Sequence, residues 1–210
     1  MTHIALFGAS GKTGTEFLKI ALANNYTVKA LVRNQEKVQV KHEKLTIIQG
    51  DVLNEADVKK TIEGTEIVVS LFGQVKDSPE MLQTQGTKHI IQAMNAQGIN
   101  KIISLSGGGL PFEKDEPKFI DKTIRTIMKT FFSKILNDAI AHAEVLKASD
   151  KDWIIVRGPR LTEEEEKGEY RVGWVGVNAG TSIGRKDLAD FILTLVNSNE
   201  YLHQMPFVSY

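Results

Sequence analysis

The sequence predicts a doubly wound α/β fold, in which helices cover both faces of a parallel sheet. Short apolar runs rich in β-branched residues alternate with helical patterns along the chain, and a glycine-rich turn follows the first run. Strands that are apolar on both faces are typical of a parallel sheet buried between two layers of helices. No repeat and no low-complexity linker divides residues 1–210, so we expect one domain.

The predicted strands are the apolar runs at residues 4–7, 27–32, 45–49, 66–72, 101–106 and 153–156. Helical patterns occupy residues 13–23, 54–62, 79–97, about 117–148 and 185–197. Asn54 and Ser78 precede acidic first turns, and Pro79 stands where a first helical residue tolerates proline. These signals give two of the predicted helix starts a physical reason.

The composition excludes several classes of function. The 26 basic residues balance the 26 acidic ones, so the chain lacks the basic field that binds nucleic acid or an anionic membrane. The absence of cysteine excludes disulfides, thiolate metal sites and cysteine nucleophiles, and we expect no bound metal. No apolar run reaches the roughly 20 residues that span a bilayer, and no basic and apolar leader precedes the first strand. We therefore expect a cytoplasmic protein with neither nucleic acid nor membrane as a partner.

The stretch HIALFGASGKTGTEF, residues 3–17, places Gly8, Gly11 and Gly14 between the first strand and the first helix. Such glycines allow a tight turn and bring the backbone close to a pyrophosphate, which the free N–H groups of the helix start attract. The side chains of Ser10, Lys12 and Thr13 add donors. A plain strand-to-helix turn remains the alternative, whereas a Walker loop fits poorly because Thr15 and Glu16 follow the last glycine.

The ends of the next strands indicate how a dinucleotide would bind. Arg33 ends the second predicted strand, where an arginine accommodates a 2′-phosphate, so the sequence favours NADPH over NADH; a solvated surface arginine is the alternative. Asp51 and Val52 follow the third strand, where they would contact the adenine or only form a turn. The fourth strand leads to residues that would pass close to the middle of the cofactor, namely Leu71, Phe72 and Gly73.

In their order along the chain, GASGKTG, ALVRN, GDVLN, SLFG, SLSGGGL and DWIIVRGPRL resemble the landmarks of the atypical short-chain dehydrogenase/reductase group. They are most similar to the NADPH-dependent flavin reductases related to biliverdin reductase B. The resemblance implies a Rossmann-type fold, with Ser106 near the nicotinamide. The cofactor contacts expected from the resemblance and the strand ends together are Gly8, Ser10, Gly11, Lys12, Thr13, Gly14, Arg33, Asp51, Val52, Leu71, Phe72, Gly73, Pro159 and Arg160.

The chain also departs from this pattern. Many short-chain dehydrogenases use a tyrosine and a lysine four residues later as an acid and its helper. No lysine stands at that spacing after any of the tyrosines, which are Tyr26, Tyr170, Tyr201 and Tyr210. We expect Leu136 and Ile140 at the corresponding positions, and Arg160 in place of the histidine of biliverdin-reducing relatives.

The expected reaction is hydride transfer from NADPH to a flavin, FMN or FAD, or to a quinone. The reduced form of such an acceptor is stabilised by conjugation, so no strong catalytic acid is required. Ser106 and the glycines after it would hold the acceptor's carbonyl oxygen; a strand-end serine in a flexible turn is the alternative. A non-catalytic NADP(H) sensor remains a second hypothesis, while an epimerase or dehydratase fits poorly without the tyrosine and lysine.

Two further segments carry expectations. The run EEEE, residues 163–166, predicts an exposed loop that is either simply solvated or a mobile flap over the site. Apolar residues at helical spacing between 124 and 136 favour the protein core or a subunit interface over a membrane surface, so we expect a monomer or a homodimer. His142 is expected to be exposed on this helix.

Overall fold

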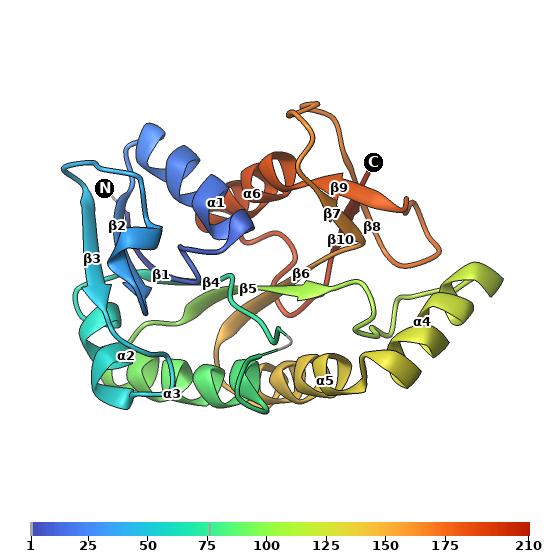
Figure 1. The fold of residues 1–210 in the computed structure, drawn as a ribbon, viewed down its shortest axis with the longest axis horizontal. Helices are drawn as coiled ribbons and strands as arrows, with labels where there is room; N and C mark the ends of the chain where they lie inside the picture. Colours follow the sequence, from blue (N-terminus) through green and yellow to red (C-terminus); the bar gives the residue numbers. More distant parts are fainter. Residues whose placement is uncertain (1, 76) are drawn as a thin grey trace.

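The computed structural model describes residues 2–75 and 77–210, apart from the side chain of Ile120. Its centre is an eight-stranded sheet in the order β3-β2-β1-β4-β5-β6-β10-β8 (Figure 1). The strands are β1 (His3–Phe7), β2 (Thr27–Val32), β3 (Leu45–Gln49), β4 (Ile67–Ser70), β5 (Lys101–Gly107), β6 (Asp152–Gly158), β8 (Arg171–Gly173) and β10 (Phe207–Ser209). All neighbours pair in parallel except β8, which is antiparallel to β10. The predicted doubly wound α/β fold is confirmed.

Two layers of helices cover the sheet (Figure 1). One layer contains α1 (Lys12–Ala23) and α6 (Arg185–Thr194), which a short 3₁₀ turn, Leu195–Asn197, extends. The other contains α2 (Glu55–Ile62), α3 (Leu82–Gln97) and α5 (Ser133–Lys147). Each layer has its own apolar core, with Phe17 and Leu188 fully buried in the first and Ile90 and Leu146 in the second. Burial on both faces explains why the central strands are apolar throughout.

The helix starts illustrate both a correct and a wrong prediction. Asn54 caps α2 as expected, because its side chain accepts the N–H groups of Ala56 and Asp57. The start predicted at Ser78 and Pro79 is wrong, since α3 begins only at Leu82. The N–H of Leu82 donates to the Gln74 side chain, and those of Gln83 and Thr84 donate to the Asp138 carboxylate of α5, 54 or 55 residues away in sequence. No local signal reveals a cap of this kind.

The long helix predicted over residues 117–148 is in fact two helices. The chain breaks at Phe132, which separates α4 (Phe119–Phe131) from α5. Figure 1 shows α4 projecting away from the sheet beyond the start of α5. Of the two expected roles for these apolar residues, the protein core is wrong for those on α4, because Ile124 and Ile127 remain about half exposed and Phe131 is 75% exposed. Leu136 on α5 is buried as expected, and a subunit interface stays a prediction.

The expectation that His142 is exposed is also wrong, because its side chain is fully buried under the sheet. Its ring nitrogens lie 2.9 Å from Thr87 Oγ1 and 3.0 Å from Ser104 Oγ. Burial lowers the pKa of His142 to about 4, and the nearby negative charge of Asp138 offsets only part of this effect. The histidine is therefore a neutral core residue at physiological pH.

The sequence patterns missed the short strands near the carboxyl end of the chain. Strands β7 (Arg160–Thr162) and β9 (Ser182–Gly184) form a separate two-stranded sheet, while β8 and β10 extend the main sheet. Each has only three residues, too few for any periodicity to show. None of the helices in the part of the chain that is described is long and apolar enough to cross a membrane.

Candidate functional site

The glycine turn between β1 and α1 is shaped by two close backbone approaches. Gly8 has φ +90°, and a Cβ placed on it would lie 2.6 Å from the backbone nitrogen of Phe72. A Cβ on Gly14 would lie 2.0 Å from the carbonyl oxygen of Gly8. Gly11 is different, because a Cβ there would meet only the Gly8 oxygen, at 3.2 Å. Gly8 and Gly14 are thus required by the fold, whereas Gly11 leaves the turn open toward a ligand.

The start of α1 presents unsatisfied donors to this opening. Helix α1 begins directly after Gly11, and no side chain caps its first N–H groups. Thr15 is turned away from the opening, since its hydroxyl donates to the carbonyl oxygen of Ala9. Uncapped N–H groups at the positive end of a helix dipole form an anion site.

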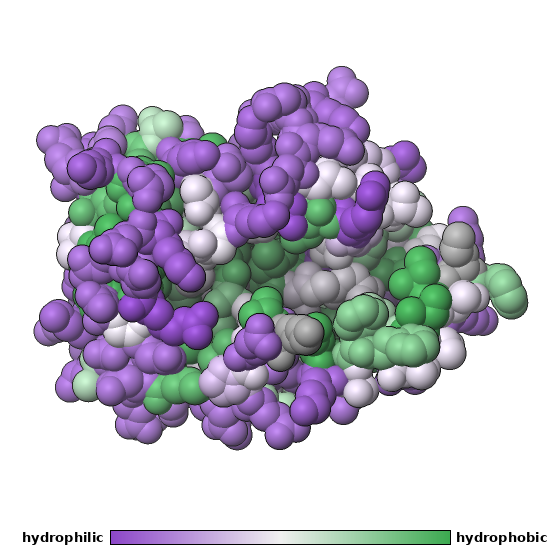
Figure 2. Space-filling view, viewed as in Figure 1, coloured by the Kyte–Doolittle hydropathy of each residue, from purple (hydrophilic) through white to green (hydrophobic). Residues whose placement is uncertain are grey.

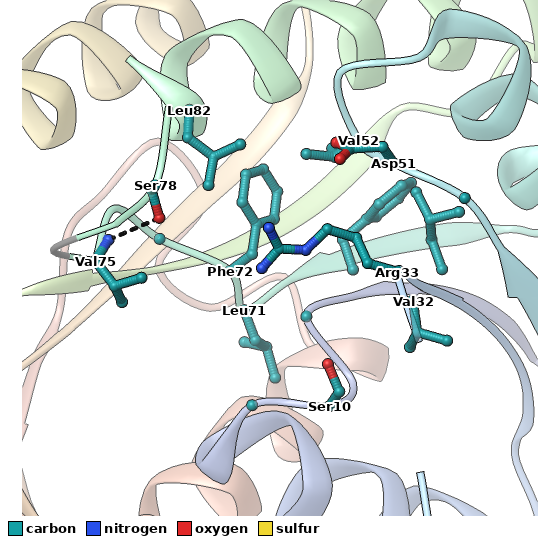
Figure 3. Close-up of a pocket in the computed structure, with 16 residues that line it drawn as sticks. Ser10, Val32, Arg33, Asp51, Val52, Leu71, Phe72, Val75, Ser78 and Leu82 are labelled. Carbon is teal, nitrogen blue, oxygen red and sulfur yellow. Dashed lines mark hydrogen bonds between the residues drawn. The ribbon is translucent and has the colours of Figure 1, made fainter. Parts of the chain in front are cut away.

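A first cavity of ≈ 260 Å³ lies beyond the carboxyl ends of β1, β2 and β4 (Figure 3). The predicted residues that line it are Gly8, Ser10, Gly11, Arg33, Asp51, Val52, Leu71, Phe72 and Gly73. In Figure 3, Arg33 extends into the cavity. Asp51 has a structural task there as well, because one of its carboxylate oxygens accepts the N–H of Leu53 at 2.9 Å. Both interpretations of Asp51, turn former and ligand contact, are therefore compatible with its position.

A second cavity continues from the first and shares Gly11, Leu71, Phe72 and Gly73 with it. It is bounded by the ends of β5 and β6 and by α5, and its predicted lining residues also include Lys12, Thr13, Ser106 and Pro159. The Ser106 hydroxyl is buried and has no hydrogen-bond partner among the described residues. A buried unpaired hydroxyl typically costs about 1–3 kcal/mol, so its position at a cavity wall favours a bound group as its partner.

The helix α5 faces the second cavity with Ile135 and Ala139. These positions have the spacing of a tyrosine and lysine pair but lie one residue before the expected Leu136 and Ile140. Leu136 is buried and Ile140 packs against the core, so neither expected residue lines the cavity, and their assignment to the tyrosine and lysine positions stays a prediction. Both positions on the cavity side are apolar, as the expected pair also was.

Several residues of the second cavity were missed by the sequence analysis, among them the polar residues Gln74, Gln83 and Arg185. Gln83 lines it from the start of α3, and its side-chain amide donates to the carbonyl oxygen of Leu105 at 3.1 Å. The Gln83 backbone N–H donates to the fully buried Asp138, which thereby positions the glutamine. The detectable signal was Asp138 itself, a carboxylate in the middle of an apolar helical pattern.

Arg185 is another missed residue, and it lines the second cavity at the first position of α6. Its guanidinium donates to the carbonyl oxygen of Leu161 and lies 3.8 Å from Glu163. A cation at a helix N-terminus is unfavourable to the helix because it opposes the helix dipole, so we interpret Arg185 as a candidate ligand contact. Arg160, which the sequence predicted as a cofactor contact, is exposed on β7 and does not line the cavities described above.

The acidic run 163–166 is exposed, as expected, but it also contacts the glycine turn. Lys12 Nζ donates to Glu163, and Lys186 donates to Glu165. The hydrogen bond from Lys12, together with the charges of Lys12 and then Arg185, lowers the pKa of Glu163. The run therefore lies at the rim of the anion site and neutralises its cations.

These features fit a dinucleotide cofactor. The uncapped N–H groups of α1 and the exposed Lys12 suit a pyrophosphate, and the exposed Arg33 suits a second anion on the far side of the first cavity. The unpaired hydroxyl of Ser106 lies where the far end of such a molecule would reach. The chain thus offers donors along one continuous cavity at the carboxyl edge of a parallel sheet, where ligands of this fold bind.

Comparisons with known proteins agree with this geometry. A UPF0659 protein of Schizosaccharomyces pombe is 24% identical over 97% of this chain and 87% of its own length. A short-chain dehydrogenase/reductase from Veillonella parvula, solved in complex with NADP, has a TM-score of 0.82 at 16% identity, covering 100% of this chain and 94% of its own. ChuY, an anaerobillin reductase from Escherichia coli O157:H7, has a TM-score of 0.81 at 19% identity, covering 100% and 97%. These structures share the Rossmann-type fold with this chain.

The NAD(P)H-binding family matches residues 8–199, from the first glycine of the turn to the end of the last helix. This range includes every predicted cofactor residue and all lining residues of the two cavities except Phe7. The chain therefore belongs to the NAD(P)H-binding family, with a fold of the short-chain dehydrogenase/reductase type.

Proposed function

We propose that this protein is an NADPH-dependent reductase that transfers hydride to a conjugated acceptor, a flavin or a quinone. The observation that carries the proposal is the second cavity: the unpaired Ser106 hydroxyl stands at its wall, and it continues directly from the predicted cofactor cavity. Among the described residues that line it there is no tyrosine, histidine or carboxylate. Such a cavity suits an acceptor that needs orientation and exclusion of water more than it needs a strong acid.

Each part of the chain has a task in this proposal. Bound NADPH would supply the hydride. The first turn of α1 binds its pyrophosphate, and Arg33 binds the 2′-phosphate. Leu71 and Phe72 exclude water between the two cavities, and Ser106 donates a hydrogen bond to a carbonyl oxygen of the acceptor. The proton that completes the reduction comes from water or from the Ser106 hydroxyl in exchange with water.

The relatives support a reductase without fixing its acceptor. ChuY is an anaerobillin reductase, and the Veillonella protein was solved with NADP. Neither identity exceeds 19%, so the acceptor must be argued from this chain's own cavity. A non-catalytic NADP(H) sensor is the second candidate, favoured by the same absence of an acid among the lining residues.

The cofactor part is tested by titration with NADPH and NADH. Charge-assisted hydrogen bonds to a phosphate contribute about 1.5–3 kcal/mol, so Arg33→Ala should weaken NADPH binding about ten- to a hundredfold and leave NADH binding nearly unchanged. Arg171→Ala is the matched control, an exposed arginine on β8 at the far edge of the sheet. Equal affinity of the wild-type protein for both cofactors would overturn the role of Arg33.

The reaction is tested by following nicotinamide absorbance with FMN, FAD, a soluble quinone and a simple ketone. We expect turnover with the conjugated acceptors and very little with the ketone. Ser106→Ala should reduce the rate about two- to twelvefold, as for a lost neutral hydrogen bond, and the exposed Ser133→Ala should not. A loss of several thousandfold would reveal a true proton donor. No turnover with any acceptor would favour the sensor.

A further inference from the structure

Helix α4 carries the largest group of exposed apolar side chains in the described part of the chain. Of the large apolar residues that are exposed, all but Val75 lie on α4 or directly after it: Phe119, Ile124, Ile127, Phe131 and Phe132. Phe119 is 86% exposed and Phe131 is 75% exposed. In Figure 2, apolar atoms gather at the edge of the molecule where Figure 1 places α4. At the helical period Ile124, Ile127 and Phe131 share one face of α4, whereas Phe119 lies elsewhere on the helix, and an exposed apolar helix face marks an interaction surface.

The same helix concentrates positive charge. Residues 118–134 contain five of the 26 basic residues and one of the 26 acidic ones, so this segment has a net charge of +4 and the rest of the chain has −4. The expectation of no membrane partner rested partly on the total charge, which hides this asymmetry. It also rested on the lack of a membrane-spanning apolar run and on assigning the apolar spacing of residues 124–136 to the core or a subunit interface. At the 3.6-residue period, Ile124, Ile127 and Phe131 share one face of α4, and Lys122 and Lys129 lie on another.

The threonine hydroxyls of α4 tolerate a poorly hydrated environment. The hydroxyls of Thr123, Thr126 and Thr130 each donate to the backbone carbonyl four residues earlier, at 2.9–3.0 Å. These groups are already paired, so removing water from them costs little. An apolar face with aromatic side chains and a lysine-rich polar face is typical of a helix that lies in the surface of an anionic bilayer.

The helix is also next to the second cavity. It ends at Phe131, and α5 begins two residues later and lines that cavity with Ile135 and Ala139. Met128 of α4 packs toward Gly109, two residues beyond Gly107 in the cavity wall. A bilayer that holds α4 would therefore lie close to the cavity in which we place the acceptor.

We infer that α4 docks this protein on an anionic membrane surface and that its acceptor is a lipid-soluble quinone taken from that membrane. The second part rests on the proposed function: NADPH transfers a hydride to the quinone, a proton from water joins it, and NADP⁺ and the hydroquinone result. A second copy of the chain fits α4 less well, because two such helices would bring together segments that each carry +4.

Docking is tested without cofactor, by co-sedimentation of the full chain with phosphatidylcholine vesicles that either contain or lack phosphatidylserine. We expect binding only to the anionic vesicles, weakened by salt. Ile127→Gln combined with Phe131→Gln should reduce binding at least about tenfold. Thr126→Gln combined with Thr130→Gln is the control on another face of the same helix and should change it little. Both pairs replace exposed side chains, so both proteins should fold.

The charge contribution has its own matched pair. Lys122→Gln with Lys129→Gln should weaken binding to anionic vesicles about tenfold, whereas Lys37→Gln with Lys41→Gln removes the same charge from an exposed loop region elsewhere and should not. If the protein ignores both kinds of vesicle, the inference is overturned. A concentration-dependent dimer in light scattering that the Ile127 and Phe131 changes abolish would instead assign the face to a second copy.

The acceptor is tested with a long-chain quinone dissolved in the same vesicles and a short-chain quinone in solution. We expect the long-chain quinone to be reduced faster in anionic than in neutral vesicles, and the advantage to disappear in the Ile127 and Phe131 variant. If only the soluble quinone reacts, the membrane-acceptor inference fails while the proposed function stands. If the protein binds vesicles and reduces FMN or FAD but neither quinone, the acceptor inference fails while the proposed function stands. If it reduces neither quinone nor flavin, the proposed function fails as well.

Discussion

Residues 3–98 and residues 108–210 differ in what holds them in place. In the first segment, β1 pairs with β2 over five residues, β2 with β3 over five, and β1 with β4 over four. In the second, β6 pairs with β5 over seven residues, but the later strands have short ladders: β10 pairs with β6 at a single residue, and β7–β9 and β8–β10 have three residue pairs each. The first cavity is lined by residues of the first segment alone, whereas the second cavity takes eight lining residues from the first segment, three from β5 and six from the second segment.

Two carboxylates, those of Asp115 and Asp187, hold loops of the second segment in place. Asp115 binds Arg157 through both carboxylate oxygens at 2.8 Å and also accepts the N–H groups of Phe112 and Val175. Asp187 accepts the N–H groups of Lys167 and Gly168 and the hydroxyl of Tyr210. Backbone pairing thus holds the strands of residues 3–98 in place, whereas a few charged side chains fix the loops of residues 108–210.

The largest effect is expected in the glycine turn. Gly14→Ala would drive a Cβ to 2.0 Å from the Gly8 carbonyl oxygen, so α1 must separate from β1, and we expect a loss of more than about 4 kcal/mol in the free energy of unfolding. Gly11→Ala is the matched control, with its tightest contact at 3.2 Å. It should fold normally but bind NADPH poorly. Equal stability of the two variants in urea unfolding would contradict this division.

A smaller effect is expected from the buried ion pair. Asp115→Ala leaves the fully buried Arg157 without its counter-ion, and breaking such a pair costs about 3–5 kcal/mol. The double variant with Arg157→Met should recover much of this loss, because no buried charge remains. Hydrogen exchange should locate the loosening in residues 108–118 and 171–177 and leave β1 to β4 protected. Uniform loss of protection along the chain would argue against separate tethering of residues 108–210.

The third prediction concerns pH and the buried His142 of α5. The unfolded histidine has a pKa near 6.5 and the folded His142 has one of about 4, so the unfolded state binds the extra proton between these values. Stability from the neutral ring is complete above about pH 6.5 and falls with acidification, by about 3 kcal/mol at pH 4. His142→Gln should flatten this part of the pH dependence of urea unfolding, and the exposed His42→Gln should leave it unchanged. Parallel pH profiles for all three proteins would refute it.

The smallest effect is expected at the rim, where the two segments meet. Glu163 pairs with Lys12 and Arg185, so Glu163→Gln should free these cations for the cofactor and raise NADPH affinity about two- to fivefold at low salt. The gain should vanish as salt screens the charges. Glu169→Gln, an exposed acid of the same segment, serves as control. Unchanged affinity in both variants would mean that the acidic run is merely solvated.

In residues 3–98 the sequence alone predicted most features closely, apart from the start of α3. Strands β2 and β3 begin and end at the predicted residues, and Asn54 caps α2 as its type and position indicated. Of the predicted site residues, only Gly14 and Arg160 fall outside the lining of the two cavities, and Gly14 still shapes the turn. These features depend on local patterns, namely apolar runs, glycine spacing and polar side chains directly after strands, which a linear sequence displays.

Other features were decided only by the tertiary structure, through contacts made by residues 108–210. Asp138 caps a helix that begins 56 residues earlier, Arg185 replaces Arg160 at the cavity, and His142 lies in the core. The same apolar helical spacing buries Leu136 on α5 and exposes Phe131 on α4. Periodicity shows that a helix has an apolar face, but what covers that face depends on contacts between residues distant in sequence, and here nothing within the described chain covers that of α4.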